Sequence, residues 1–473
     1  MAGLISALNA GKTSLEVNQK TIEVIGNNIS NINTEGYSKQ TTQLSPYPSL
    51  NFGDFFVGQG VKISDVQRAH DVFVTNQLQN KSIDLGFANG QTDALTQLEG
   101  TFNITDNNIA TNTDKFFDAL NQLSTNPSDL TLRDTVIQQG NILATSFNNA
   151  ANALDTITTN INNTLTSKVD DLNAKISQIA DLNQRIYTIE IHGQTANSAR
   201  DQRDLLAKDL AQSLGANTYT DNRGMLAVQL PGGLPLVQGT TAMSLETSAS
   251  GSNVSLQLQA AGTTRDLTIN TVGGEIKGLL TVRDQIIPSA KNDLDKLASE
   301  ISTQVNIQHA AGAGLDGSTG NNFFNDPTVA SPPAATAWTD AARNMKVTLT
   351  DASKVAAAAA PTPPATVAPG DNTNALAMAG IGKNYLIGGI DTFDSYYSKI
   401  TSRIGLASNQ NSLAVSGSQD AVNQLQNLRD SVSGVSLDEE MINMISYQRG
   451  FQSSAKFLST VDDMMNTLMS VKN

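Results

Sequence analysis

The sequence offers few groups of residues whose types and spacing could do chemistry. The clearest is Gly11-Lys12-Thr13, which matches the end of a phosphate-binding loop. In such a loop, backbone N–H groups and the Lys side chain hold the phosphates of a nucleotide, and the loop follows a strand. Here Ser6 occupies the position of the first glycine of that pattern, and no strand pattern precedes it. We therefore expect no nucleotide site.

Histidines and carboxylates are the other candidates, because they can bind a metal or transfer protons. The three histidines, His70, His192 and His309, lie far apart and lack metal-ligand spacing. The acidic run 438–440 begins a helical pattern, where carboxylates stabilise the first turn and the helix dipole. The absence of cysteine excludes disulfides, thiolate zinc sites and cysteine nucleophiles. We predict that the protein is not an enzyme and needs no cofactor or metal.

Composition and charge narrow the kinds of partner. The chain has 473 residues and a formal net charge of -14, and its sequence pI is about 4.6. A protein that grips nucleic acid needs clustered Lys and Arg, so we expect no nucleic-acid partner. No run is long and apolar enough to cross a bilayer, and the start is a poor secretory signal. We expect no membrane partner, and no cleaved signal peptide if the protein is exported.

The N-terminal residues carry a coiled-coil pattern. From Leu4 to Ile32, mostly apolar positions recur at alternating steps of four and three, and Gly11 and Asn18 interrupt the series. A polar residue in such a seam commonly sets register rather than adding stability. The pattern predicts one long amphipathic helix.

A second, Met-rich seam runs from Met441 to Leu468. Each terminal helix has a narrow apolar stripe and nothing of its own to bury it on, so we expect the two helices to pack on each other. The alternative is that both are ordinary terminal helices that pack on a core. Methionine fills irregular gaps, which suits a further interface between subunits.

The middle of the chain alternates in character. Residues 131–191 show the longest helical periodicity, and residues 71–102 show a shorter one. Short alternating segments between 214 and 275 indicate antiparallel strands. Proline and alanine concentrate between 327 and 369, which is typical of a loop or linker. Helix returns from about 278 to 309 and again from about 392.

These patterns predict a mainly α protein with a β-rich insert, in which paired terminal coiled-coil helices join a long-helix, rod-like domain and a small antiparallel β domain. We expect a terminal assembly domain of residues 1–60 with 425–473. The long-helix domain would comprise residues 61–213 with 276–310 and 390–424. The β-rich outer domain would comprise residues 214–275 with 311–389, including the Pro- and Ala-rich linker.

Both ends of the chain carry a family likeness. The stretch NNISNINTEGYSKQ, which starts at Asn27, resembles the N-terminal signature of flagellar axial proteins, and the region around SLDEEMINMISYQRGF resembles their C-terminal end. Between them, GQGVKISDVQRAHDVFVTNQL, RDQRDLLAKDL and NIQHAAGAGLDGSTGNNFF are similar, in order, to the flagellar hook-associated protein 1 family. The likeness covers nearly the whole chain, and the segment 327–369 carries it least.

The resemblance implies a structural component of the bacterial flagellum. Such a protein would be an adaptor at the hook–filament junction that assembles on the hook tip and permits filament growth. Its partners would be copies of itself in a ring or helical layer, hook protein and a second hook-associated junction protein. It would be extracellular after export by the flagellar type III route, with an export chaperone bound within residues 425–473.

Two alternatives stay open. One is another axial protein, of hook or rod, although the segment NIQHAAGAGLDGSTGNNFF is not expected there. The other is a secreted coiled-coil adhesin or an enzyme with an insert domain, which would need a signal peptide or an active site.

The candidate functional residues are those of an assembly interface. They combine the two seams with the polar signature, whose asparagines we expect to form hydrogen bonds at subunit contacts; the alternative for these asparagines is simple solvation of a helix end. The candidates are Leu4, Leu8, Leu15, Asn18, Ile22, Ile25, Asn27, Asn28, Ile29, Asn31, Ile32, Asn33, Gly36, Tyr37, Met441, Met444, Phe451, Leu458, Met465 and Leu468.

Overall fold

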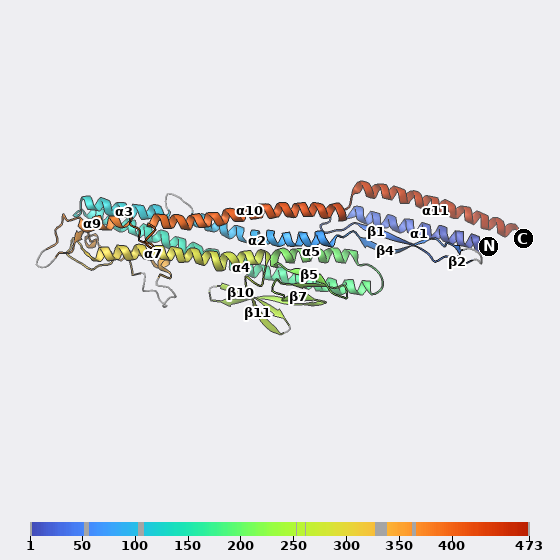
Figure 1. Cartoon of the computed structure of the whole chain (residues 1–473), viewed down its shortest axis with the longest axis horizontal. Helices are drawn as coiled ribbons and strands as arrows, with labels where there is room; N and C mark the ends of the chain where they lie inside the picture. Colours follow the sequence, from blue (N-terminus) through green and yellow to red (C-terminus); the bar gives the residue numbers. More distant parts are fainter. Residues whose placement is uncertain are drawn as a thin grey trace.

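The computed structural model describes residues 2–51, 56–102, 108–251, 253–260, 262–326, 338–361 and 366–471. The molecule is long and narrow (Figure 1), and long helices run along most of its length. Helices α2 (Val72–Phe102), α4 (Leu130–Glu190) and α10 (Phe393–Ser433) form the body. Helices α1 (Ala2–Ser30) and α11 (Leu437–Val471) form one end, where both chain termini lie. The predicted fold class, mainly helical with small antiparallel sheets, is confirmed.

Helix α4 is the long helix that periodicity predicts. Its N-cap is Asp129, whose side chain accepts hydrogen bonds from the backbone N–H groups of Thr131 and Leu132. Apolar residues three or four positions apart, such as Leu143, Phe147, Ala151 and Leu154, are fully buried along one face. At 61 residues, the helix spans about 90 Å.

The core of the body lies between α4 and its neighbours. Helices α3 (Ile109–Thr125), α5 (Asn197–Leu214), α6 (Gly274–Thr281) and α7 (Ile287–Ala310) bury their apolar faces with α2, α4 and α10 in one continuous cluster. A five-residue π-helical segment, Val282–Ile286, joins α6 to α7. This continuous packing makes the body a rod.

Two antiparallel sheets lie on the side of α4 (Figure 1). They are held partly by asparagines of that helix that bind strand backbone. Asn173 donates to the carbonyl of Leu245 (2.8 Å) and accepts from its N–H (2.7 Å). Asn183 does the same with Leu226, at 2.8 and 3.0 Å. The four-stranded sheet contains β5 (Asn217–Thr220), β6 (Leu226–Gln229), β7 (Pro235–Gln238) and β8 (Thr241–Ala242), and the three-stranded sheet contains β9 (Ser244–Ser250), β10 (Asn253–Ala260) and β11 (Thr263–Leu267).

Residues 311–326 and 338–389 lie elsewhere than expected, as far as the structure describes them. The sequence analysis grouped them with the strands of 214–275, whereas they pack at the far end of the rod against α3, α4 and α7. Buried Phe323 and Phe324 stack there with Phe116, which explains the position. The elements in this region are β12 (Gly312–Ala313), α8 (Ala341–Asn344), the 3-10 turn Ala352–Lys354, β13 (Ala358–Ala359) and α9 (Thr373–Ile381). Much of the Pro- and Ala-rich segment, 327–337 and 362–365, lies outside the described residues.

A hairpin arm follows the N-terminal helix, and the sequence analysis did not predict it. Strand β1 (Gln40–Pro46) pairs antiparallel with β4 (Val61–Arg68), and short strands β2 (Leu50–Asn51) and β3 (Phe56–Val57) extend the arm. The arm lies along α1: Thr21 Oγ1 is 3.2 Å from Thr42 Oγ1, and Ser6 Oγ donates to the carbonyl of Gly58 (3.3 Å). Helix α1 is therefore covered by β strands on one side and by α11 on another.

Candidate functional site

The helices at the two ends of the chain pack on each other, as predicted, and the structure shows that they are antiparallel. Ser14 Oγ lies 2.8 Å from Ser454 Oγ, whereas Asn28 Nδ2 donates to Glu440 Oε2 (3.0 Å). Residue numbers thus rise along α1 as they fall along α11. The helices diverge from the rod together and end side by side (Figure 1).

The interruptions in the N-terminal seam lie at the closest approach of the two helices. A Cβ on Gly11 would lie 3.1 Å from Leu458 Cδ1, and a Cβ on Gly450 would lie 2.8 Å from Asn18 Oδ1. Glycine permits such approach because it has no side chain. Asn18 Nδ2 donates to the carbonyl of Ser14 (2.8 Å), so this amide is satisfied within its own helix.

The apolar members of the seams are buried to different extents. Ile25 is 4% exposed, whereas Leu4, Leu8, Leu15, Ile22 and Ile29 are half-buried. On α11, Met444, Phe451, Leu458 and Met465 are half-buried. Our expectation for Ile32 needs correction: α1 ends at Ser30, so Ile32 lies in the following turn and is 39% exposed.

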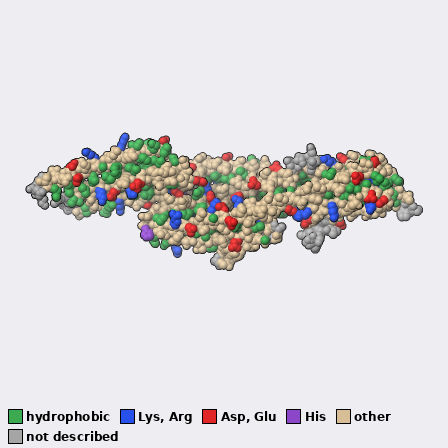
Figure 2. Space-filling view, turned by 180° about the vertical axis from the view of Figure 1, so that it is seen from behind, with side chains coloured by type: hydrophobic (Ala, Val, Ile, Leu, Met, Phe, Trp, Pro, Cys, Tyr) green, Lys and Arg blue, Asp and Glu red, His purple; other side chains and the backbone are tan. Residues whose placement is uncertain are grey.

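Apolar side chains remain exposed along α11 and on the adjoining end of α10. We call this set of residues the outer apolar face. Met441 and Leu468, expected in the seam, belong to it, at 50% and 46% exposure. Figure 2 shows hydrophobic side chains gathered over this end of the molecule. Exposed apolar patches of this kind mark sites of protein association. The members of the face are Leu428, Val432, Leu437, Met441, Ile442, Ile445, Met464, Leu468 and Met469.

Asn28 of the polar signature has a role inside the chain. Its side chain is 1% exposed. Besides Glu440, Nδ2 donates to the carbonyl of Gln40 (2.9 Å), and Oδ1 accepts from the N–H of Gln40 (3.0 Å) and from Tyr37 Oη (2.8 Å). An asparagine side chain offers two donors and two acceptor sites, so its capacity is filled. We therefore correct the expectation that Asn28 contacts another subunit.

The other signature asparagines lie at the surface. Asn27 Oδ1 lies 3.0 Å from Tyr37 Oη, so it shares with Asn28 the one proton of that hydroxyl, and it accepts from Asn31 Nδ2 (3.2 Å). Asn33 is exposed. For Asn27, Asn31 and Asn33 a place at subunit contacts stays a prediction. Burial, followed by the nearby negative charge of Asp201, raises the pKa of Tyr37 to about 12, so its hydroxyl remains a donor at neutral pH.

Gly36 turns the chain from α1 towards the rod. Its φ is +80°, in the left-handed region that favours glycine, and a Cβ there would lie 3.4 Å from Leu205 Cβ. Its carbonyl accepts a hydrogen bond from Arg429 Nη2 of α10 (2.9 Å). Gly36 therefore allows the turn and ties it to the rod.

A buried ion-pair cluster fixes the hairpin arm to α5. Arg68 Nη1 is 2.7 Å from Asp201 Oδ1, and Arg68 Nη2 is 2.6 Å from Asp204 Oδ2. Asp201 Oδ2 also accepts from the backbone N–H of Ser38 (3.1 Å). We call residues 28–40 with these three charged residues and Arg429 the joint. The sequence analysis missed Arg68, Asp201 and Asp204, although RDQRD marks a concentration of charge there.

The acidic start of α11 also belongs to this region. Lys39 Nζ lies 2.9 Å from Glu439 Oε2 and 3.4 Å from Glu440 Oε1. The bond to Glu439 raises the pKa of Lys39. These carboxylates thus link the helix start to the signature turn.

The remaining chemical candidates do not converge. Lys12 lies within helix α1. His70 lies between β4 and α2, His192 follows α4, and His309 lies in α7. Across the described residues, no group of three or more histidines and carboxylates could hold a metal ion. None of the helices in the described ranges is long and apolar enough to span a membrane.

Three family models match separate parts of the chain. Residues 95–324 match the model described as the flagellar hook-associated protein FlgK helical domain. Residues 5–37 match the flagella basal body rod protein, and residues 429–471 match the C-terminal part of the flagellar basal body rod FlgEFG protein. The terminal pair is therefore similar to rod proteins, and the long-helix centre is similar to a hook-associated protein.

Whole-chain relatives agree with the central match. Flagellar hook-associated protein 1 of Escherichia coli K12 is 27% identical, covering 99% of this chain and 100% of that protein. Its counterpart in Bacillus subtilis is 26% identical, with coverage of 99% and 98%. The solved structure of the flagellar hook junction protein FlgK from Burkholderia pseudomallei covers 76% of this chain and 100% of that one, with a TM-score of 0.68 and 19% identity. That likeness supports the fold.

Proposed function

This chain belongs to the flagellar hook-associated protein 1 family, and we propose that it is a structural adaptor at the junction between the flagellar hook and the filament. It assembles on the hook tip and permits filament growth. The observation that carries the proposal is the terminal helix pair, whose outer apolar face is uncovered and whose base is fixed to a rod by the joint.

The pattern of family matches supports different roles for the ends and the centre of the chain. The terminal segments are similar to rod proteins, and the centre is similar to a hook-associated protein. We infer that the terminal pair makes the contacts common to axial proteins, and that the rod and its sheets make this subunit distinct. The central match also favours a junction protein over hook or rod protein.

The partners follow from that arrangement. Copies of the chain would lie side by side in a ring or helical layer and bury the outer apolar face between subunits. Hook protein would contact one side of the layer, and a second hook-associated junction protein would contact the other. An export chaperone would cover residues 425–473 before assembly, because an exposed apolar helix needs protection from aggregation. We further propose extracellular localisation by type III export without a cleaved signal peptide.

We propose that no catalysis is involved. The groups with unusual environments, such as Tyr37 and Lys39, are used in hydrogen bonds and ion pairs between segments of the chain. A structural role needs such contacts to fix the angle between the terminal pair and the rod.

Deletion of the gene tests the proposal. Cells should make hooks without filaments and release flagellin into the medium, and a plasmid copy should restore filaments. Normal filaments in the deletion strain would contradict the proposed function. Loss of the hooks themselves would instead indicate a rod or hook protein.

A further inference from the structure

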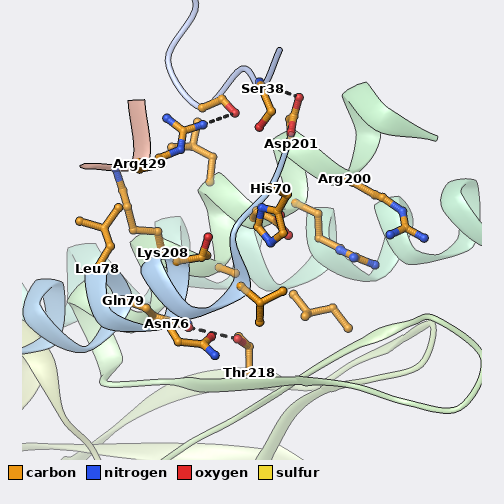
Figure 3. Close-up of a pocket in the computed structure, with 18 of the residues that line it drawn as sticks. Ser38, His70, Asn76, Leu78, Gln79, Arg200, Asp201, Lys208, Thr218 and Arg429 are labelled. Carbon is orange, nitrogen blue, oxygen red and sulfur yellow. Dashed lines mark hydrogen bonds between the residues drawn. The ribbon is translucent and has the colours of Figure 1, made fainter. Parts of the chain in front are cut away.

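A cavity of about 450 Å³ lies beside the joint. Residues from the signature turn, β4, α2, α5, β5, β6 and α10 line it, so seven segments of the chain meet there. Figure 3 shows His70 in the middle of the cavity view, with Arg429 on one side and Arg200 on the other. The volume is within the range of roughly 300 to 1,000 Å³ that is typical of small-molecule sites.

The lining is rich in cations although the chain as a whole is acidic. Five Lys or Arg side chains border the cavity, together with three carboxylates. The carboxylates already have partners: Asp201 and Asp204 pair with Arg68, and Glu35 pairs with Lys208 (3.1 Å). The other three cations that line the cavity are Arg200, Arg203 and Arg429.

Arg203 is the cation whose charge is least compensated. It is 3% exposed, and Nη1 donates to two neutral groups, Asn183 Oδ1 (3.0 Å) and the carbonyl of Gly224 (3.4 Å). Its Nε is buried and has no hydrogen-bond partner among the described residues. Burial lowers the pKa of Arg203, opposed in part by the charges of Asp204 and Glu190. A buried charge without a close counter-ion is costly, so an anion near it would be stabilising.

The other two cations differ from Arg203. Arg200 forms a bidentate pair with Glu190, with both N–O distances 2.7 Å. Arg429 donates to backbone carbonyls of the signature turn and to Asp430. Each of these two guanidinium groups therefore has a carboxylate partner, whereas Arg203 has none at ion-pair distance among the described residues.

Apolar residues complete the lining. Leu78, Leu205 and Leu226 lie on α2, α5 and β6 and border the same space. A simple inorganic anion would leave most of this surface uncovered, because a water-sized group fills only about 30 Å³. A carboxylate attached to an apolar body matches both the positive charge and the apolar wall.

We propose that this cavity is a binding site for a carboxylate that carries an apolar group. The carboxylate lies in the positive field of Arg203 and beside His70, and the apolar group packs on the leucines. The source is either a small organic acid or an acidic side chain of a neighbouring subunit with an apolar residue beside it, and the carboxylate is common to the two.

Benzoate and its neutral isostere benzamide are the probes. Histidine-selective NMR of the full-length chain follows the resonance of His70, identified through H70Q, because the sequence has three histidines. We expect benzoate to shift this resonance with a Kd of about 1 mM or tighter, and benzamide to bind at least about tenfold more weakly. Equal binding of the two probes, or no shift of His70 with benzoate, would overturn the proposal for a small acid.

Two variants test the location. Asn76 lines the cavity from an exposed position on α2, so N76W should block binding; Asn80 is exposed on the same helix but does not line the cavity, so N80W should bind like the parent. R203Q keeps an amide donor near Asn183 and should weaken benzoate binding about tenfold. Benzoate binding that survives N76W would place the site elsewhere and overturn the proposal.

A second arm distinguishes the source of the carboxylate. Cells that carry N76W or N80W are scored for incorporation of the subunit into flagella. Loss of incorporation with N76W alone indicates a carboxylate of a neighbouring subunit, with or without benzoate binding. Normal incorporation with benzoate binding indicates a small acid, and normal incorporation without it rejects the site. The binding arm does not depend on the proposed function, so the two can fail separately.

Discussion

Asn28 Nδ2 and Glu440 Oε2 are hydrogen bonded at 3.0 Å, although 412 residues separate them in the chain. Both side chains are buried, at 1% exposure each. The bond lies where the base of the terminal helix pair meets the hairpin arm. The buried asparagine of the polar signature therefore connects segments of the same chain.

Replacement of Asn28 by alanine should destabilise the protein by about 3 kcal/mol. The change removes four hydrogen bonds and leaves the buried Glu440 carboxylate and the Gln40 backbone without this partner. Urea unfolding measures the free energy. Asn33 is exposed, so N33A should stay within about 0.5 kcal/mol of the parent. Unchanged stability of N28A with defective assembly would restore the subunit-contact interpretation.

Replacement of Arg68 by methionine should loosen the joint. Asp201 and Asp204 would lose their shared cation, and removing one partner of a buried pair costs about 3 kcal/mol or more. Limited proteolysis should then cut within residues 31–40 before it cuts the rod. Lys12 has an exposed side chain and a long ion pair of 3.8 Å, so K12M is the matched control and should be nearly neutral. Equal protection of the joint in R68M and the parent would contradict its role.

A side chain at Gly450 should disturb the contact between the terminal helices. A Cβ there would lie 2.8 Å from Asn18 Oδ1, so in G450A the Asn18 amide must move and its hydrogen bond to the carbonyl of Ser14 is strained. Helix propensity alone predicts the opposite, a stabilisation of about 1 kcal/mol. Gly405 of α10 has no atom within 4 Å of the point that a Cβ would occupy, so G405A shows the propensity effect by itself. Calorimetry should rank G405A above the parent and G450A below it; the reverse order would refute close packing at this point.

Acidification should destabilise the far end of the rod through His309. The imidazole is fully buried, with Nδ1 2.6 Å from the carbonyl of Asn321 and Nε2 accepting from the N–H of Ala356 (3.0 Å). Burial lowers the pKa of His309 from its ordinary value of 6.5. The unfolded chain therefore binds the proton more tightly, so stability is present above about pH 6.5 and is lost as pH falls.

The measurement compares the free energy of unfolding of the parent with that of H309Q at pH 7.5 and 5.5. The parent should lose up to about 1.4 kcal/mol relative to the variant over this interval. His192 is exposed, and H192Q serves as the control for the general effect of pH. A difference between parent and H309Q that does not change with pH would exclude this contribution.

Much of the fold could be predicted from hydrophobic periodicity, because long amphipathic helices place apolar residues at regular intervals in the sequence. The pattern at 131–191 found α4 to within a residue at each end, and the two terminal seams found α1 and α11. The hairpin arm was missed because its strands are polar and half-exposed, with weak alternation. The described residues between 311 and 389 were misplaced because their position depends on distant contacts, such as those of Phe324 with Phe116.

The candidate site, too, could be predicted from the sequence only in part. The sequence predicted the helix pair, because a narrow apolar stripe must be buried on something. It could not predict that Gly11 and Asn18 face close contacts, since the partner atoms belong to α11. The cluster of Arg68 with Asp201 joins residues 133 positions apart. The charged run RDQRD marks one side of this cluster, but nothing in the sequence indicates that Arg68 is its partner. The residues of the outer apolar face also could not be predicted from sequence. A buried residue of the seam and an exposed residue beside it can be neighbours in the sequence, and only the structure tells them apart.

The central claim is that the outer apolar face makes the subunit contacts on which the filament grows. Ile442, a member of this face, is 67% exposed, and Ser177 is exposed on α4 of the rod. The most direct measurement introduces I442D or S177D into the deletion strain and images flagella by electron microscopy, with secreted protein quantified from the medium. The account predicts that both variants are exported, that I442D leaves hooks without filaments, and that S177D restores filaments. Normal filaments with exported I442D would contradict it.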